Sequence, residues 1–399
     1  MKVALLNSVT SGSTGKICCG LARRLENDGH AARIFYGRGH APCDAPAMRI
    51  EENGSIYTHV ALARMCDRSG FGSARATRML VSALKDYDPD VIHLHNLHGY
   101  WLHLPMLFAY LQTCGKPVVW TLHDCWAFTG HCAYFDEVAC EKWRSGCGGC
   151  PALSAYPKSF CIDQSARNFV EKQRLFTAVP NLTLATPSSW LRDRIAQSFL
   201  RDTPVRVLPN GVDRTVFCPT ESDLRARFGL AGKRVLLGVA NVWEKRKGLE
   251  TFFALRKHFG ADTAIVLIGL TKKQQRALPE GILGFGRTNG ARELAAWYTL
   301  ADVLVDATRE ENFPTTHLEA LCCGTPVATF CAGGSAEMLT HTCGAFAPVG
   351  DVDGLAAAID SAMDCTAGNC LAQSEKYDEQ RRFAAYVDLY ESLCKGESE

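Results

Sequence analysis

Short apolar runs alternate with amphipathic stretches along the whole chain. The runs in the first half are VALLNSV, DVIHLHNL, PVVWTLHD and NLTLATPS, and those in the second half are RVLLGVAN, TAIVLIG, ADVLVDAT and TPVATF. Helical segments such as GLETFFALRKHFG, ARELAAWYTLA and TTHLEALCCG lie between the later runs. Because strands that alternate with helices build parallel sheets covered on both faces, the pattern predicts a doubly wound α/β fold. Such sheets bind ligands at the carboxyl ends of their strands.

The same pattern predicts two domains. The strand VRV is followed by the turn signal PNG, and the alternation of strands and helices starts again after it. We therefore place the domains at residues 1–204 and 205–399, with a cysteine-rich insertion at 125–161 in the first. The last segment, 376–395, has the pattern of an amphipathic helix that could pack back on the first domain.

The composition indicates a globular protein without a strong net charge. The 399 residues are 47% hydrophobic and 21% charged, with a net charge of +1, so nucleic acid is not an expected partner. No apolar run reaches the length of about 18 residues that a membrane span needs, and segment 100–112 is typical of a buried or cleft-lining helix. The N-terminus has no signal-peptide layout, which predicts a cytoplasmic protein with mostly reduced thiols. Cysteines within apolar runs are expected to be small core residues (Cys18, Cys19, Cys322 and Cys323).

The first turn, SGSTGK, looks like part of a phosphate-binding loop. A Walker A loop requires G-x-x-x-x-G-K-[ST], but Thr10 stands at the first glycine and Ile17 at the Mg²⁺-binding hydroxyl. Because a Walker A loop needs both the first glycine and the Mg²⁺-binding hydroxyl, the match fails. Gly12 and Gly15 instead predict a tight turn from strand to helix, and Lys16 need not contact a phosphate.

The strongest chemical signal is the stretch EENFPTTHLEALCCGTPV at 310–327. Glu311 lies in a loop after a predicted strand, and Glu319 lies one turn into the helix that follows. The N-terminus of that helix offers backbone N–H groups and partial positive charge, which bind phosphate. Carboxylates on either side suit hydroxyl groups. Together they predict a site for a sugar attached to a nucleoside diphosphate.

The sequence resembles the retaining glycosyltransferases of family 4, also called group 1, and among them enzymes of bacterial exopolysaccharide, colanic-acid-type and lipopolysaccharide clusters. The motifs NSVTSGSTGKI, VIHLHNLHGYW, TLHDCWAFTG, LPNGVD, GVANVWEKRKG and EENFPTTHLEALCCGTPV occur in the family's order and span nearly the whole chain. The resemblance implies the GT-B fold, in which two Rossmann-like domains face each other across a cleft. It makes 1–204 the acceptor-side domain and 205–399 the nucleotide-sugar domain.

The resemblance also assigns a donor site. Glu311 would hold hydroxyls of the donor sugar, and Glu319 would hold the ribose. Lys247 would neutralise the departing diphosphate in place of a metal ion, so no cofactor is expected for catalysis. The family's first loop, which approaches the donor phosphates, falls on Gly12 and Gly15. The backbone between the two glutamates would receive the phosphates (Asn312, Phe313, Pro314, Thr315 and Thr316).

One position departs from the family pattern. The family usually carries an arginine six positions before its lysine, where this chain has Asn241. Lys245 or Arg246 could supply the missing charge, or the diphosphate site could be weaker. The substitution keeps open an alternative: a catalytically degenerate GT-B scaffold that only binds carbohydrate or nucleotide.

In the first domain the resemblance points to histidines. His123 ends a predicted strand and matches the family's histidine near the donor sugar, where its charge is adjustable near neutral pH. Asp124 could orient His123 or bind the acceptor. His95 and His98, at the end of another strand with His93, could line the acceptor site, although a purely structural role explains them equally well.

The insertion contains a cysteine cluster. Cys147 and Cys150 have the C-x2-C spacing of zinc knuckles, and Cys132 and Cys140 precede them at a wider spacing. Four thiolates could hold a structural zinc ion. The alternatives are separate free thiols, or ligands with other partners (Cys125, Cys161 or His131).

Two other enzyme classes fit less well. A P-loop NTPase would need the two missing Walker A positions, and a nucleotide-sugar isomerase or oxidoreductase would need a G-x-G-x-x-G turn that SGSTGK lacks. The expected partners are a UDP- or GDP-sugar donor and a glycan or lipid-linked acceptor. A lipid-linked acceptor would bring the protein into peripheral contact with the inner membrane.

Overall fold

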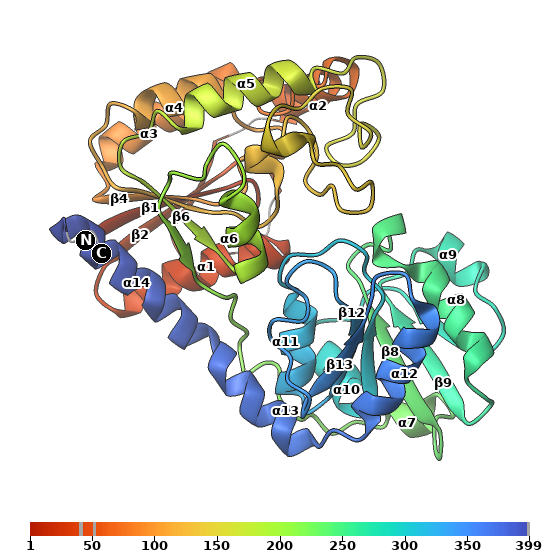
Figure 1. The fold of residues 1–399 in the computed structure, drawn as a ribbon. Coiled ribbons are helices and arrows are strands. Elements are labelled where there is room, and N and C mark those ends of the chain that lie inside the picture. Colours follow the sequence, from red (N-terminus) through yellow and green to blue (C-terminus); the bar gives the residue numbers. More distant parts are fainter. Residues whose placement is uncertain (40–42, 51–52, 397–399) are drawn as a thin grey trace. The chain divides into compact units, whose positions relative to one another are not determined.

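The computed structural model describes residues 1–39, 43–50 and 53–396, which divide into two compact units (Figure 1). Unit 1 consists of Met1–Pro209 and Arg382–Glu399, and unit 2 consists of Asn210–Arg381. The sequence places the domain boundary slightly earlier, after residue 204. Unit 1 is discontinuous because the C-terminal segment belongs to it.

Unit 1 is built on a seven-stranded parallel sheet with the order β3-β2-β1-β4-β5-β6-β7. Its strands are β1 (Lys2–Asn7), β2 (Ala31–Tyr36), β3 (Ala47–Arg49), β4 (Val91–Leu94), β5 (Val118–Thr121), β6 (Leu182–Thr186) and β7 (Val205–Val207). Its helices are α1 (Gly12–Asn27), α2 (Asn53–Cys66), α3 (Ala74–Tyr87), α4 (Leu104–Leu111), α5 (Ser165–Phe176), α6 (Ser189–Ile195), the short η1 (Trp126–Phe128) and η2 (Lys142–Arg144), and most of α14 (Glu379–Lys395).

Alternate residues of β1 supply two different cores. Ala4 and Leu6 belong to the core beneath α3, α4 and α5, whereas Val3 and Leu5 belong to the core beneath α1 and α14 (Figure 1). Successive side chains of a strand point to opposite faces, so a strand covered on both sides has to be apolar throughout. This explains why the sequence shows a continuous apolar run here.

Unit 2 contains a six-stranded parallel sheet with the order β10-β9-β8-β11-β12-β13. Its strands are β8 (Arg234–Val239), β9 (Thr263–Ile268), β10 (Ile282–Phe285), β11 (Val303–Asp306), β12 (Val327–Phe330) and β13 (Gly344–Ala347). Its helices are α7 (Leu224–Arg227), α8 (Leu249–His258), α9 (Lys272–Arg276), α10 (Ala291–Leu300), α11 (Thr315–Cys322), α12 (Val352–Met363), α13 (Ala367–Ser374), and the short η3 (Lys245–Lys247) and η4 (Glu375–Tyr377).

The unit 2 sheet is also covered on both faces. Leu236 packs into the core with α8 and α12, while its neighbours Val235 and Leu237 pack into the core with α10, α11 and α13. The predicted doubly wound parallel fold is therefore confirmed in both units. Both sheets place the loops after their strands at a carboxyl edge.

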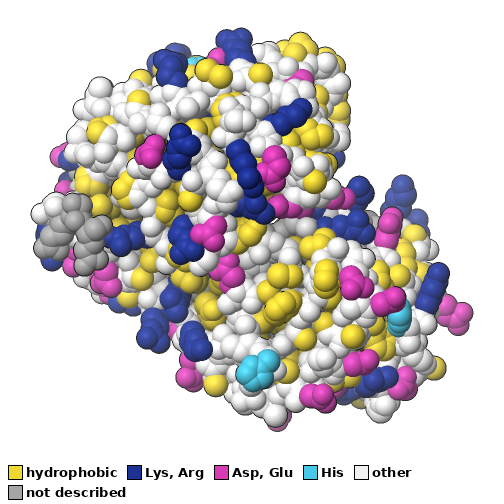
Figure 2. Space-filling model, viewed as in Figure 1, with side chains coloured by type: hydrophobic (Ala, Val, Ile, Leu, Met, Phe, Trp, Pro, Cys, Tyr) yellow, Lys and Arg dark blue, Asp and Glu magenta, His cyan; other side chains and the backbone are white. Residues whose placement is uncertain are grey.

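Segment 100–112 forms a shorter helix than its apolar run suggests. Helix α4 begins only at Leu104, because Pro105 suits the first helical turn and Tyr100 adopts a positive φ of 68° before it. Within the described residues, no helix is both long enough and apolar enough to cross a membrane. The visible surface in Figure 2 intersperses basic and acidic side chains, in line with the small net charge.

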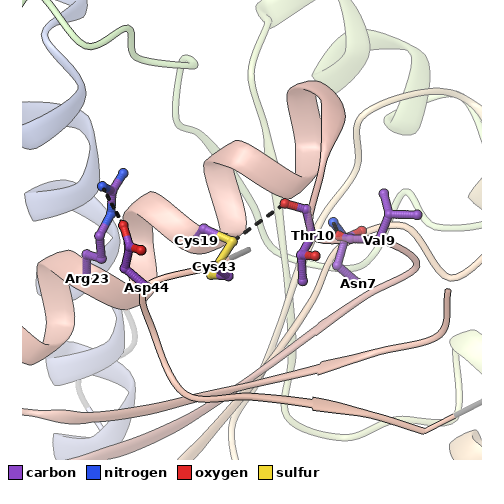
Figure 3. Close-up of a disulfide and its surroundings, with 7 residues drawn as sticks. All are labelled: Asn7, Val9, Thr10, Cys19, Arg23, Cys43 and Asp44. Atoms are coloured by element: carbon purple, nitrogen blue, oxygen red, sulfur yellow. Dashed lines mark hydrogen bonds and ion pairs between the residues drawn. A yellow bond between two sulfur atoms is a disulfide. The ribbon is translucent and has the colours of Figure 1, made fainter. Parts of the chain in front are cut away.

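A disulfide joins Cys19 and Cys43, which corrects the expectation that Cys19 is a reduced core thiol (Figure 3). Cys19 lies on α1 and Cys43 follows β2, and their Cα atoms are 6.0 Å apart. Arg23 and Asp44, 3.9 Å apart, connect the same two segments. The remaining cysteines of the described chain are free thiols, as expected for most of them.

Candidate active site

Glu311 and Lys247 form a charged pair at the carboxyl edge of the unit 2 sheet. Glu311 lies in the loop after β11, and Lys247 ends η3 in the loop after β8. The Lys247 Nζ is 2.6 Å from Glu311 Oε2, and Arg246 Nη1 is 3.8 Å from the same oxygen. Burial would raise the pKa of Glu311, but Lys247 and Arg246 lower it overall. The carboxylate is therefore anionic although it is only 14% exposed.

Backbone contacts hold Lys247 beside Glu311. Gly248 has a φ of +68°, and a Cβ there would lie 2.2 Å from the Ala307 carbonyl oxygen, so no other residue fits without a shift. The Arg309 N–H donates to the Arg246 carbonyl over 2.8 Å. These contacts lay the loop after β8 directly on the loop after β11. The KRKG sequence is thus a packed turn of the site.

Glu319 is held by a tyrosine that sequence reasoning missed. The Tyr298 hydroxyl on α10 donates to Glu319 Oε2 over 2.9 Å, and Tyr298 is fully buried. Helix α11 begins at Thr315 with Pro314 at its N-cap and no side-chain capping bond. The residues between the two glutamates are therefore the loop and first turn at a helix N-terminus, as the sequence predicts.

Two further backbone segments of this loop are already engaged. The Asn312 N–H donates to Glu311 Oε1 over 3.1 Å. The Asn210 amide donates to the Phe313 carbonyl over 3.2 Å. The loop is thus preorganised around the Glu311 carboxylate. Thr316 follows in the first turn of α11.

Asp306 and His317 form a second buried pair beneath the loop. His317 Nε2 is 2.9 Å from Asp306 Oδ2, and His317 Nδ1 is 3.2 Å from the Ser335 carbonyl. Both partners of the ring are hydrogen-bond acceptors. Burial would raise the pKa of Asp306, but His317 lowers it well below its usual range. The only sequence signal was the position of the two residues: Asp306 ends a strand, and His317 lies two residues before Glu319 on the same helix.

Unit 1 presents histidines at its carboxyl edge. His95 Nδ1, after β4, is 3.1 Å from His123 Nε2, after β5, and the two rings stack. Burial lowers the pKa of His123 to about 4 and that of His95 well below its ordinary value. Both rings are therefore neutral at neutral pH. The structure brings together these two sequence-predicted residues.

Asp124 pairs with His98. His98 Nε2 is 2.9 Å from Asp124 Oδ2, and His98 Nδ1 is 3.0 Å from the Tyr156 hydroxyl. The Trp126 N–H donates to the other carboxylate oxygen over 2.9 Å. Burial would raise the pKa of Asp124, but His98 lowers it overall. Asp124 thus orients His98 directly.

His93 lies behind His95 and is hydrogen-bonded to a tyrosine, a contact that the sequence did not indicate. The Tyr390 hydroxyl of α14 is 2.6 Å from His93 Nδ1, and Thr121 Oγ1 is 2.8 Å from His93 Nε2. The His93 ring packs on the His95 ring, with centroids 4.1 Å apart. Burial lowers the pKa of His93 to about 3. A chain of contacts therefore runs from α14 to His123.

The glycine turn after β1 joins the same edge. A Cβ on Gly15 would lie 2.4 Å from the Thr10 backbone, so the helix can begin this close to the strand only with glycine. Gly12 has a φ of +71° and opens the helix. The Asn7 side chain accepts from the Asn96 N–H over 3.1 Å, which ties the turn to the loop after β4. The turn is thus a fixed part of the histidine edge.

The four cysteines of the insertion line one small cavity together with His131 and Trp143. Cys132 donates a hydrogen bond to Cys150, and the Gly130 N–H donates to Cys147 Sγ over 3.2 Å. Across the described residues, however, no group of three or more His, Cys, Asp or Glu side chains is arranged to hold a metal ion. The structure therefore brings Cys140 and the other three together but offers no zinc geometry.

Two doubly wound parallel sheets, each with polar or charged side chains at its carboxyl edge, are the architecture of the GT-B fold. The chain belongs to Glycosyltransferase Family 4, whose model matches residues 15–216, and the model for glycosyl transferases group 1 matches residues 233–364. The protein is therefore a glycosyltransferase of the hexosyltransferase class, which transfers a sugar from a nucleotide sugar. The family and fold predicted from the sequence motifs are confirmed.

Similar proteins cover most of the chain. It is 26% identical over 353 residues to the putative colanic acid biosynthesis glycosyl transferase WcaC of Escherichia coli K12, covering 84% of each chain. It is 26% identical over 286 residues to the GDP-mannose-dependent alpha-mannosyltransferase of Mycobacterium tuberculosis, covering 69% of this chain and 65% of that protein.

Solved structures share the whole architecture. Sucrose-phosphate synthase from Thermosynechococcus elongatus has a TM-score of 0.72 at 18% identity, covering 99% of both chains. Anabaena Alr3699/HepE in complex with UDP has a TM-score of 0.70 at 16% identity, covering 98% of this chain and 100% of that one. At these identities the likeness establishes the fold alone.

Proposed function

We propose that this protein moves a hexose, with retention of configuration, from a UDP- or GDP-sugar to a hydroxyl of a glycan or lipid-linked glycan in bacterial surface polysaccharide synthesis. The Lys247–Glu311 pair carries the proposal, because it sets an ammonium against a buried carboxylate at the ligand edge of a parallel sheet. The names of similar proteins support it: one acts in colanic acid biosynthesis, one depends on GDP-mannose, and one binds UDP.

In this proposal, Glu311 and Lys247 serve opposite ends of the bond that breaks. The Glu311 carboxylate accepts hydrogen bonds from hydroxyls of the donor sugar. The Lys247 ammonium stabilises the negative charge that develops on the departing diphosphate. Arg246, close to the same carboxylate, adds a second positive charge.

The loop between the glutamates binds the rest of the donor. The N-terminus of α11, at Thr315, faces its partial positive charge toward the phosphates. Glu319 accepts from the ribose hydroxyls, and the Tyr298 hydroxyl keeps its carboxylate in one orientation. No metal ion takes part in this scheme.

His123 contributes a neutral ring to the reaction. Because its pKa lies far below neutrality, it offers a hydrogen bond to the transferring sugar without adding charge. We infer front-side attack: the acceptor oxygen bonds to the anomeric carbon as the bond to the phosphate oxygen breaks, and that phosphate oxygen takes the acceptor proton. His95 and His98 would line the acceptor side. A lipid-linked acceptor would place the enzyme at the cytoplasmic face of the inner membrane.

A thermal-shift screen against UDP, GDP, dTDP and their sugar conjugates, without added metal, tests the donor site. Stabilisation by one nucleotide class identifies the donor base, and transfer assays with its sugars follow. Glu311→Gln should reduce transfer by about 100-fold or more, because it removes a charged acceptor at the reacting sugar. Glu280→Gln, an exposed carboxylate of unit 2, is the matched control. Full turnover in the Glu311 variant, or no response to any nucleotide, would contradict the proposal and favour a degenerate scaffold.

A further inference from the structure

Three loops lie together at the carboxyl edge of the unit 2 sheet, and the first of them, after β8, carries Lys247. The Ala240 N–H, after β8, donates to the Ile268 carbonyl at the end of β9 over 3.1 Å. The Gly269 N–H, after β9, donates to the carbonyls of Phe285, the last residue of β10, and of Gly286, each over 3.1 Å. Backbone hydrogen bonds thus fix the residues that follow β8 and β10 relative to one another.

Arg287 extends from the third loop to the first. Its Nη2 donates to Asn241 Oδ1 over 2.9 Å, and Asn241 directly follows Ala240. This contact uses one of the five N–H donors of the guanidinium. The arginine is therefore aimed back along the strand ends toward the loop that leads to Lys247.

Arg287 differs from Lys247 and Arg246 in what lies beside its charge. Lys247 and Arg246 both lie within 4 Å of the Glu311 carboxylate, at 2.6 and 3.8 Å. Within residues 1–39, 43–50 and 53–396, Arg287 forms no ion pair, and its hydrogen-bond partner is a neutral amide. An arginine at a ligand edge whose charge no carboxylate neutralises suits an anion, and its planar fork matches phosphate oxygens.

We propose that Arg287, oriented by Asn241, binds the diphosphate of the nucleotide-sugar donor. This inference rests on the proposed function and deepens it. It answers the question that Asn241 raises in the sequence: the cation comes from a different strand end, and the asparagine serves as its anchor. Arg287 thereby complements Lys247, whose charge is shared with Glu311.

Calorimetric titration with UDP, GDP, UMP and GMP tests the assignment. We expect Arg287→Gln to weaken binding of the recognised diphosphate at least 10-fold and binding of its monophosphate less than 3-fold, since the second phosphate gives the arginine its main contact. Arg227→Gln, an exposed arginine on α7 ahead of the amino end of β8, should bind both like the wild type.

The outcomes separate this inference from the proposed function. Unchanged diphosphate affinity in Arg287→Gln, with normal wild-type binding, overturns the role of Arg287 and leaves the donor site intact. An equal loss for monophosphate and diphosphate also overturns it, because the residue would then support the loop as a whole. If the wild type binds none of the four nucleotides, the proposed function fails, and this inference fails with it.

Discussion

The two sheets present opposite electrostatics at the same architectural position. At the carboxyl edge of unit 1, His93, His95 and His123 are neutral, because burial lowers their pKa values. His93 is hydrogen-bonded to two hydroxyls, and His95 Nδ1 pairs with His123 Nε2. At the carboxyl edge of unit 2, Asp306 and Glu311 are anionic despite burial, because opposite charges lie within 3 Å of each.

The comparison shows what burial does with and without a partner charge. Burial alone moves a titratable group toward its neutral form, whereas burial with a close opposite charge preserves both charges. The same fold therefore offers a neutral hydrogen-bonding edge in one unit and a charged edge in the other. Fold alone does not decide the chemistry of a strand end.

The largest expected effect is the acid sensitivity of unit 1. Burial lowers the pKa to about 4 in His59, about 3 in His93 and about 4 in His123, while unfolded histidines titrate near 6.5. Between these values only the unfolded chain binds the protons, so stability is complete above about pH 6.5 and falls as pH decreases. We expect a loss on the order of 3 to 5 kcal/mol between pH 6.5 and 5 in urea unfolding.

His59→Asn sharpens this prediction. The His59 Nε2 accepts from the Gly70 and Gly72 N–H groups, so protonating it in the folded state would break both bonds. Removing it should lower the slope of stability against pH by about 1.4 kcal/mol per pH unit. His341→Asn, an exposed histidine, should leave the slope unchanged. Equal slopes in both variants would show that the folded protein does not keep His59 neutral.

The second prediction removes a partner charge from unit 2. Asp306→Asn should cost about 3 to 5 kcal/mol in denaturant unfolding, because it leaves the fully buried His317 without its counter-charge. The pKa of Asp306 is depressed, so its contribution is present above about pH 4 and is lost as pH falls below that value. Asp360→Asn, an exposed carboxylate on α12, is the control.

A double variant checks that the pair is the cause. Adding His317→Gln to Asp306→Asn should recover part of the lost stability. Replacing both partners costs less than leaving one buried polar group without its partner. A double variant as unstable as the sum of the two single variants would mean that the residues act independently.

The third prediction concerns the disulfide, which is a further difference between the two units. The Cys19–Cys43 bond closes a loop of 24 residues within unit 1, and the described cysteines of unit 2 are free. Cys43→Ser should lower stability by about 3 kcal/mol in the chain-entropy model. Dithiothreitol should lower the wild type to the same level and leave the variant unchanged. A wild type insensitive to reductant would argue that the bond is absent in solution.

The smallest effect tests the contact between the Tyr390 hydroxyl and the buried His93 ring. Tyr390→Phe should cost about 1 to 2 kcal/mol, because it leaves the buried His93 Nδ1 without its partner. Tyr87→Phe is a matched control, since its hydroxyl has no hydrogen-bond partner among the described atoms. Equal effects of the two changes on urea unfolding would rule out a role for the Tyr390 hydroxyl.

Most of the fold was predictable from the sequence because central strands are apolar on both faces. The inner strand β2 and the edge strands β3, β10 and β13 were not named as strands, since they are short or carry polar positions. The family motifs pointed to Lys247 and Glu311 as site residues, but not to the ion pair between them.

Partners across the chain were not predictable. Tyr298 reaches Glu319, and Arg287 reaches Asn241, through tertiary packing, and their sequence neighbourhoods carry no spacing signal. The partner of Cys19 was equally hidden, because an odd number of cysteines, 19, allows many pairings. Hydrogen-bond partners far apart in the chain depend on the assembled sheet, which local patterns do not encode.

The discontinuity of unit 1 sets an order in which the protein is completed during synthesis. Phe383, Tyr386 and Tyr390 fill one of the unit 1 cores, yet they come after the whole of unit 2. The ribosome therefore finishes Asn210–Arg381 while unit 1 still lacks part of its interior and the Tyr390 contact to His93. Domains generally fold as they emerge from the ribosome. Unit 1 is synthesised first but completes its fold last, because its core and the contact of His93 with Tyr390 require α14.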